Sequence, residues 1–129
     1  MQPVLRVAIQ KSGRLSEETL SLLEACGVHG LRGSTRLRVK SSSFPLECIF
    51  VRDDDILHYI QDGAADIGIA GENIILEEQL AGGNPLRKKN EVKIQKRLGF
   101  GKCRLSIAVE KTFAYQNLQS LSGLRLATS

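Results

Sequence analysis

The stretch LRVAIQKSGRLS, residues 5–16, predicts a strand, a short loop and the start of a helix. A short apolar run rich in β-branched residues ends before Lys11, and an amphipathic helix is expected to open at Ser16. Lys11 and Arg14 therefore stand where a strand passes into a helix N-terminus. Exposed amides and the positive end of a helix dipole favour anions, so this loop predicts a phosphate site.

The spacing of this loop matches neither of the two general nucleotide-binding patterns. A Walker loop needs Gly-x-x-x-x-Gly-Lys-Ser/Thr, and a dinucleotide loop needs Gly-x-Gly-x-x-Gly. An ordinary strand-to-helix connection with solvated basic residues therefore stays open as an alternative at this point.

Strand and helix patterns alternate along the chain with short connections. The spacing predicts a first helix ending near Gly27, a second from the Asp53-Asp54-Asp55 run to Gly63, and strands over 35–40, 46–51, 65–70, 104–109 and 123–127. A break is expected at 81–85, followed by a solvated basic loop at 87–90. This order is typical of an α/β domain with a largely parallel sheet and a ligand at the carboxyl ends of its strands.

Composition narrows the class of protein. The 129 residues are 42% hydrophobic and 25% charged, as in a globular protein, and no apolar run approaches the length of a membrane span. Without a signal-peptide pattern at the N-terminus, we expect a cytoplasmic protein that binds no membrane. The net charge of +4 suits small anions, whereas two Tyr, four Phe and no Trp supply few stacking surfaces for nucleic acid.

The Cys and His residues predict no metal site. Cys26, Cys48 and Cys103 are an odd number without a Cys-x-x-Cys pair, so we expect reduced, partly buried thiols. His29 and His58 have no partner at metal-ligand spacing and are expected at the surface.

Two charged runs leave alternatives open. Arg36, Arg38 and Lys40 alternate along a predicted strand and would share one face, which a solvated edge strand also explains. The Asp53-Asp54-Asp55 run could ligate a hard cation, but an Asp cap with neighbouring dipole partners is the more economical interpretation.

Several stretches together resemble the ATP phosphoribosyltransferase family, which opens histidine biosynthesis. They are QKSGRLS at 10–16, RDDDI at 52–56, ADIGIAGEN at 65–73, GFGKCRLS at 99–106 and LATS at 126–129. These matches follow the family's order across the chain. The first two are closer to the long, hexameric form of the family than to the short form.

The resemblance implies a two-lobed α/β fold, similar to type II periplasmic binding proteins, with a mixed, mostly parallel sheet. Residues 1–101 would form most of catalytic lobe one, and residues 102–129 the beginning of lobe two. The family's loop for ribose 5-phosphate and the long form's histidine-binding domain have no counterpart here. We therefore expect an N-terminal fragment that is inactive alone, from a protein that forms a homo-oligomer, either a dimer or a hexamer.

The implied reaction joins N1 of ATP to C1 of phosphoribosyl pyrophosphate and releases pyrophosphate, with Mg²⁺ bound to the substrates. The negative charge on the departing pyrophosphate is stabilised by positioned cations, and the reaction needs no strong base. The expected catalytic residues are Arg14 and Arg36. The expected substrate-binding residues are Lys11, Ser12, Gly13, Asp55, Gly71, Glu72, Asn73 and Cys103, the last without a role as nucleophile.

Two other functional classes are considered beside the enzyme. A noncatalytic module of the same fold would hold a small anion or a nucleotide without turnover. A nucleic-acid-binding domain would use Arg32, Arg36, Arg38 and Lys40, and would bind long strands with a steep salt dependence.

Overall fold

A four-stranded sheet organises the N-terminal part of the chain. The computed structural model describes residues 2–81 and 91–128. The strands lie in the order β2-β3-β1-β4, with β3 and β4 parallel to the central β1 and β2 antiparallel to β3 at one edge. Their bounds are β1 Leu5–Gln10, β2 Arg38–Lys40, β3 Leu46–Val51 and β4 Ile67–Gly68. The expected mixed, mostly parallel α/β sheet is thus confirmed.

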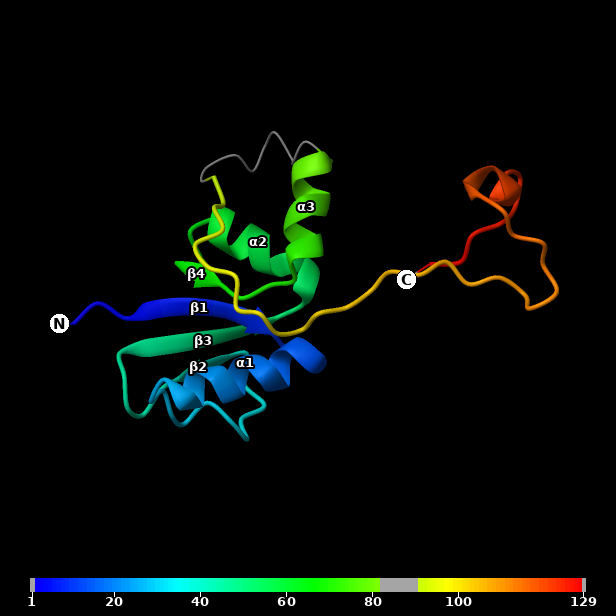
Figure 1. The fold of residues 1–129 in the computed structure, drawn as a ribbon. Coiled ribbons are helices and arrows are strands. Elements are labelled where there is room, and N and C mark those ends of the chain that lie inside the picture. The colour runs from blue at the N-terminus through cyan, green and yellow to red at the C-terminus, as the bar shows by residue number, and fades with distance from the viewer. Residues whose placement is uncertain (1, 82–90, 129) are drawn as a thin grey trace.

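Two helices cover opposite faces of this sheet, and a third packs beside one of them (Figure 1). The helices are α1 Arg14–Ala25, α2 Asp53–Gln61 and α3 Glu72–Leu80, and a 3-10 turn, η2, spans Leu118–Leu121. Successive side chains of a strand point to opposite faces of the sheet, so β1 and β3 each contribute to the hydrophobic core on either face. Val7 and Ile9 of β1 face the α1 side, whereas Ala8 faces α2.

The order of the strands creates a crevice. From β1 the chain crosses one face through α1 to reach β3, and from β3 it crosses the other face through α2 to reach β4 on the far side of β1. The connections after β1 and β3 therefore diverge, although the Lys11 amide still donates to the Val51 carbonyl at 2.8 Å. Ligands of open α/β sheets bind at such a switch point, outside the carboxyl ends of the strands.

The first helix starts earlier than the sequence pattern indicates. Gly13, with φ +106° and ψ −174°, is the N-cap of α1, and no side chain caps the helix. Ser16 is instead the third residue of the helix and is buried, as Thr19 and Leu20 are, so the expectation that it opens the helix was wrong. Arg14 thereby falls in the first turn. The predicted end at Gly27 is confirmed by the Gly27 amide, which donates to the Glu24 carbonyl.

The second helix corrects the predicted Asp cap. Arg52 is the N-cap of α2, and its three Asp residues all lie in the first helical turn, where their charges complement the dipole. Burial, followed by the neighbouring charge of Asp54, raises the pKa of Asp53. The three Asp side chains therefore favour the start of the helix through their charge, and none of them caps it by a hydrogen bond.

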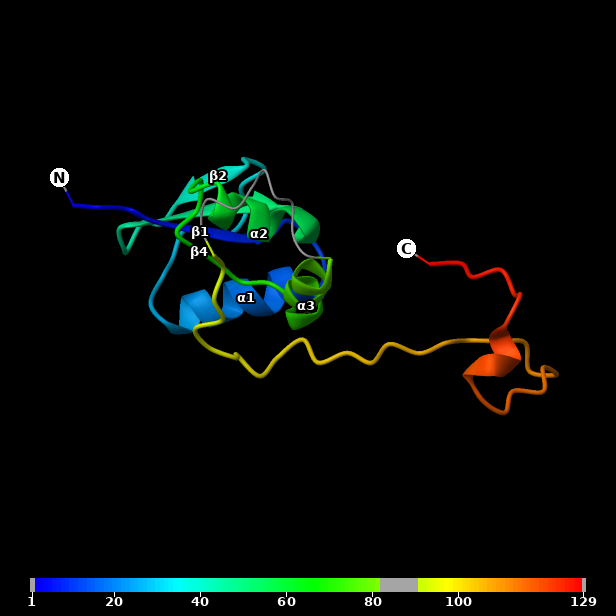
Figure 2. The same ribbon diagram turned by 90° about the horizontal axis from the view of Figure 1, so that it is seen from above.

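The C-terminal segment departs from the expected strands. Residues 104–109 and 123–127 form no strand, and the segment extends away from the sheet in both views (Figures 1 and 2). A strand needs a neighbour for its backbone hydrogen bonds, and the described residues place none beside it. Leu105 is consequently fully exposed. The expected basic loop at 87–90 and most of the break at 81–85 lie outside the described residues.

The cysteines and histidines differ in their surroundings. Cys48 is buried, and burial raises its pKa to about 11, whereas Cys26 and Cys103 are exposed, contrary to the expected partial burial. His29 is exposed as expected, but the Nε2 of half-buried His58 lies 3.9 Å from the Glu78 carboxylate. No helix in the described ranges combines the length and the apolar character needed to cross a membrane.

Candidate functional site

An open pocket of about 310 Å³ lies beside the switch-point crevice. Its walls come from the end of β1, the first turns of α1, the loop before β2 and the end of β3. Lys11 and Arg36 both line it, although they are 25 positions apart (36 − 11). The polar lining residues include Ser16, Ser34 and Thr35, and the floor includes Leu20, Leu31 and Phe50. Two cations predicted from separate motifs thus meet at one pocket.

The loop into α1 reaches this pocket through Lys11. Positive φ at Gly13 turns the chain between Lys11 and Arg14, and Lys11, Ser12, Gly13 and Arg14 are all exposed. This φ favours glycine, and a Cβ at Gly13 would in addition lie 3.2 Å from Gln10 Nε2. The first amides of α1 have no side-chain cap and are available to an anion.

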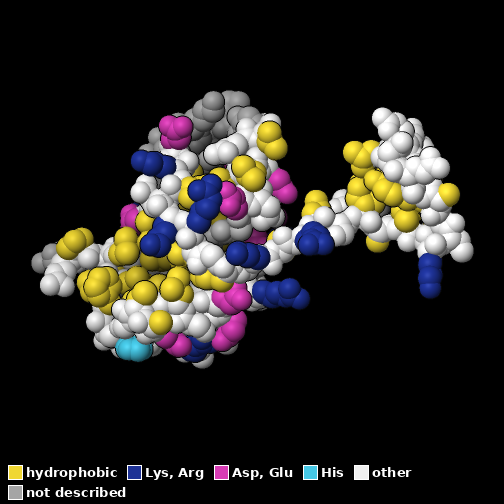
Figure 3. Space-filling model, in the orientation of Figure 1, with side chains coloured by type: hydrophobic (Ala, Val, Ile, Leu, Met, Phe, Trp, Pro, Cys, Tyr) yellow, Lys and Arg dark blue, Asp and Glu magenta, His cyan; other side chains and the backbone are white. Residues whose placement is uncertain are grey.

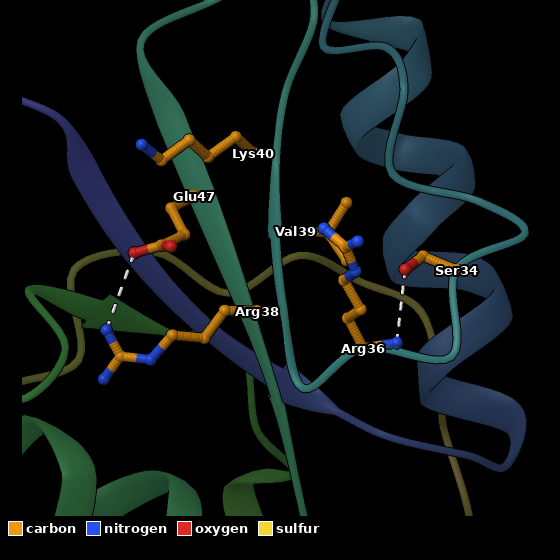
Figure 4. Close-up of a pocket in the computed structure, with 6 residues that line it drawn as sticks. All are labelled: Ser34, Arg36, Arg38, Val39, Lys40 and Glu47. Atoms are coloured by element: carbon orange, nitrogen blue, oxygen red, sulfur yellow. Dashed lines mark hydrogen bonds and ion pairs between the residues drawn. The ribbon is translucent and has the colours of Figure 1, made fainter.

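A second open pocket, of about 400 Å³, adjoins Arg36 on the side of β2 (Figure 4). Arg38 extends toward Glu47, with 3.7 Å between Nη1 and Oε2, whereas the Arg36 side chain lies apart from that pair. Arg36 precedes β2, so the alternation that was expected to align it with Arg38 and Lys40 applies only within the strand. The Arg36 amide donates to Ser34 Oγ at 3.2 Å, and no ion pair among the described residues involves the Arg36 guanidinium.

A second corner of the site forms at the start of α3. Gly71 is the N-cap of α3, and a Cβ on it would collide with Asn73 Oδ1 and would lie 3.8 Å from Leu15 Cδ1. A Cβ on Gly101 would also collide with Leu15. The starts of α1 and α3 and the segment around Gly101 therefore meet at Leu15.

Glu72 is already paired at this corner. Its Oε1 accepts from Arg97 Nε at 3.1 Å and from Nη2 at 2.8 Å. This hydrogen-bonded guanidinium lowers the pKa of Glu72. The ion pair ties the segment that follows the undescribed residues to the start of α3.

Gly68 serves packing rather than ligand access. A Cβ on this residue would lie 2.6 Å from Ile56 Cγ2 and 2.8 Å from Ile60 Cδ1, so α2 occupies the space. Gly68 therefore leaves no room for a ligand, because the space beside it faces the helix.

Of the predicted site residues, Lys11 and Arg36 line a pocket, whereas the others line neither of the two: Ser12, Gly13, Arg14, Asp55, Gly71, Glu72, Asn73 and Cys103. Asp55 is half-buried in the first turn of α2, with its amide donating to the Arg52 carbonyl at 3.0 Å. Cys103 is exposed on the segment that leaves the sheet. Sequence reasoning missed Ser34 and Thr35, whose only signal was their polarity beside Arg36. Within the described residues, no cluster of three or more His, Cys, Asp or Glu could hold a metal ion.

Comparisons with known proteins agree on one family. The family model for ATP phosphoribosyltransferase (HisG) matches residues 52–129. A protein of Cytophaga hutchinsonii named ATP phosphoribosyltransferase is 50% identical over 129 residues, which is all of this chain and 42% of that protein. A structure of the ATP phosphoribosyl transferase (HisG:HisZ) complex from Thermotoga maritima matches 59% of this chain and 36% of that chain, with TM-score 0.50 and 34% identity. The chain thus spans less than half the length of these relatives.

Proposed function

This chain belongs to the ATP phosphoribosyltransferase family, and on that premise we propose that the full-length protein joins N1 of ATP to C1 of phosphoribosyl pyrophosphate and releases pyrophosphate, the first step of histidine biosynthesis. The support is the family match over residues 52–129 and the relative that is 50% identical over the 129 residues of this chain. Because the chain spans 42% of that relative, the proposal concerns the protein as a whole.

The observation that carries the proposal is the meeting of Lys11 and Arg36 in one pocket at the switch point of the sheet. Pyrophosphate leaves with several negative charges from a ribose that becomes cationic. Such a step is accelerated by cations and amides that are already in place, since they need no reorganisation when the charge develops. The start of α1 adds backbone donors next to these side chains.

Each predicted residue has a proposed role. Arg14 and Arg36 would clamp the phosphates of the leaving group or of ATP, because a guanidinium can bind phosphate oxygens in a bidentate way. Lys11 would add charge, and Ser12 and Gly13 would donate hydrogen bonds. The proposed nucleotide contacts are Asp55, Gly71, Glu72, Asn73 and Cys103. Of these, Glu72 would first have to release Arg97.

Mg²⁺ is proposed to arrive on the phosphates of the substrates. The pocket itself offers Lys11, Arg32, Arg36 and hydroxyl groups, and its Glu17 carboxylate is already paired with Arg32, so the lining does not favour a bare cation. The ion would neutralise phosphate charge and orient the leaving group, and the chain's own residues would bind the oxygens left over.

The proposed architecture has two lobes, similar to type II periplasmic binding proteins. Residues 1–101 would form most of lobe one and residues 102–129 the opening of lobe two. Exposed apolar side chains on the C-terminal segment support this division, because the segment extends away from the sheet and a second lobe would bury them (Figure 3). They include Leu105, Ile107, Leu118 and Leu126. We further propose a cytoplasmic homo-oligomer, a dimer or a hexamer.

A pair of matched variants tests the catalytic proposal. In the full-length protein, Arg36→Ala should lower the rate of pyrophosphate release on the order of a hundredfold, the scale of losing one positioned electrostatic donor. Arg38→Ala removes the same charge from a residue that is paired with Glu47, and should change the rate by less than about threefold, as expected of a weak exposed ion pair. Equal losses in both variants would remove Arg36 from the catalytic residues.

The two other classes predict different results. A noncatalytic module would bind ATP without releasing pyrophosphate. The nucleic-acid reading is weakened by the structure, because Arg32 and Arg38, two of its four cations, are paired with carboxylates. It predicts tighter binding of long strands than of mononucleotides, with a steep loss as salt rises.

A further inference from the structure

Arg32 fastens the loop before β2 to the outer side of α1. Its Nε donates to Glu24 Oε1 at 2.6 Å, its Nη1 to Glu17 Oε1 at 2.7 Å and its Nη2 to Ser21 Oγ at 3.1 Å. The three acceptors fall one helical turn apart, so a single guanidinium spans two turns of the helix. These hydrogen bonds keep the pKa of Arg32 above its ordinary value.

The loop is held equally firmly upstream of Arg32. Ser43 Oγ accepts from the His29 amide at 2.8 Å and donates to the Gly27 carbonyl at 2.7 Å. Ser41 Oγ donates to the His29 carbonyl at 2.8 Å, and Leu31 is buried in the core. Everything up to Arg32 is thus fixed to the sheet, the core or α1.

The residues that follow have few fixed points of their own. Residues 33–36 line the anion pocket, and the Arg36 amide has a bond to Ser34 Oγ, within the same short stretch. Arg32 is therefore the last side chain that ties this pocket wall to the helix before β2 pairs with β3. On the other side of Arg36, the Leu37 carbonyl accepts from the Phe50 amide at 2.8 Å, so Arg32 and Leu37 are the two fixed points between which the stretch with Arg36 lies.

We infer that Arg32 is a positioning residue, which sets the place of Arg36 in the pocket by binding Glu24 and Glu17. This inference rests on the proposed function, since it takes the pocket to hold the phosphates of a substrate. Three of the five N–H groups of the guanidinium are already committed to α1. The alternative is that Arg32, which also lines the pocket, binds the anion directly.

The two roles make opposite predictions for Glu24. If Arg32 works through the helix, Glu24→Gln should weaken binding of pyrophosphate, as Arg32→Gln does. If Arg32 binds the anion directly, Glu24→Gln releases the guanidinium and removes a nearby negative charge, so binding should stay equal or tighten. In the double variant Arg32→Gln/Glu24→Gln, the losses of affinity add if the two residues act independently and do not add if they act through their contact.

The experiment measures pyrophosphate and ATP binding to the full-length protein by calorimetry. Arg32→Gln and Glu24→Gln should each weaken binding by about tenfold, the low end of the scale of losing an outer-shell partner, and the double variant should lose no more than the stronger single one. Arg32→Lys should rescue little, because an ammonium cannot reproduce the planar fork. Arg6→Gln is the matched control: it removes the same charge and a similar pair, with Asp66, at the other end of β1, and should not change the affinity.

Each outcome decides between the possibilities. Unchanged affinity in Arg32→Gln, or a loss there without a loss in Glu24→Gln, overturns the positioning role while leaving the proposed function intact. If the unaltered protein binds neither pyrophosphate nor ATP, the proposed function fails and the inference fails with it. If thermal denaturation shows that Arg32→Gln is unfolded, the milder Glu17→Gln and Glu24→Gln variants replace it. Weaker pyrophosphate binding in both supports the positioning role, and unchanged binding overturns it.

Discussion

Replacing Gly13 by Ala should damage both the stability and the anion site of this domain. Gly13 has φ +106° and ψ −174°, in a region that is essentially restricted to glycine. An added Cβ would also lie 3.2 Å from Gln10 Nε2, so the Gln10 side chain would have to shift. The turn between Lys11 and Arg14 could not keep its present shape.

The size of the effect follows from two opposing contributions. Holding a non-glycine residue in this region costs about 1–3 kcal/mol, while Ala stabilises by about 0.4–1 kcal/mol through the unfolded chain. The net loss of about 1–2 kcal/mol should lower the midpoint of thermal unfolding by roughly 5–15 °C in a domain of this size. Displacing Lys11 and Arg14 should weaken pyrophosphate binding by about tenfold or more.

Gly27→Ala is the matched control for this prediction. Gly27 also has positive φ, +86°, but a Cβ there would meet nothing within 4 Å, and the residue lies at the opposite end of α1. Its substitution should cost about 1 kcal/mol without changing pyrophosphate affinity. Calorimetric binding and thermal unfolding of both variants provide the test. An unchanged midpoint in Gly13→Ala, or equal affinity losses in both, would refute the reasoning.

Three further substitutions or conditions test the rest of the fold. Gly68→Val should lower the unfolding midpoint, since overpacking against Ile56 costs about 1–3 kcal/mol, and an unchanged midpoint would contradict the packing role. Hydrogen bonds from Arg6 lower the pKa of Asp66, so this carboxylate stabilises the fold above the ordinary Asp range and the contribution is lost as pH falls through the lowered value. Acid unfolding of Asp66→Asn should accordingly be shallower at the lowest pH, and identical curves would argue against the pair. Buried Cys48, with a pKa raised to about 11, should resist a thiol reagent until the protein unfolds, while the two exposed cysteines react at once; rapid labelling of all three would contradict the predicted burial.

The central sheet follows from local patterns in the sequence. The nearly continuous apolar run at 46–51 is typical of a strand covered on both faces, and residues of β3 indeed belong to the cores on both sides of the sheet. The strand predicted over 65–70 ends just before Gly71, the N-cap of α3, where a small residue precedes an acidic first turn. The position of Lys11 at the end of β1 follows in the same way.

Long-range contacts account for what the sequence concealed. Ser16 has the chemistry of an N-cap, but the conformation of Gly13 starts the helix three residues earlier and burial takes Ser16 inside. Arg32 reads as one cation in a basic stretch, and only the folded loop brings it to Glu17 and Glu24. The strand pattern at 104–109 is real in composition, yet among the described residues no neighbour supplies the hydrogen bonds that a strand needs.

The most direct test of the central claim is pyrophosphate release by the full-length protein, measured with ATP and phosphoribosyl pyrophosphate together and with each alone in the presence of Mg²⁺. The proposed transferase requires release that depends on both substrates and falls on the order of a hundredfold in Arg36→Ala. A folded protein that binds ATP but releases no pyrophosphate with both substrates present would contradict the account and would favour a binding module.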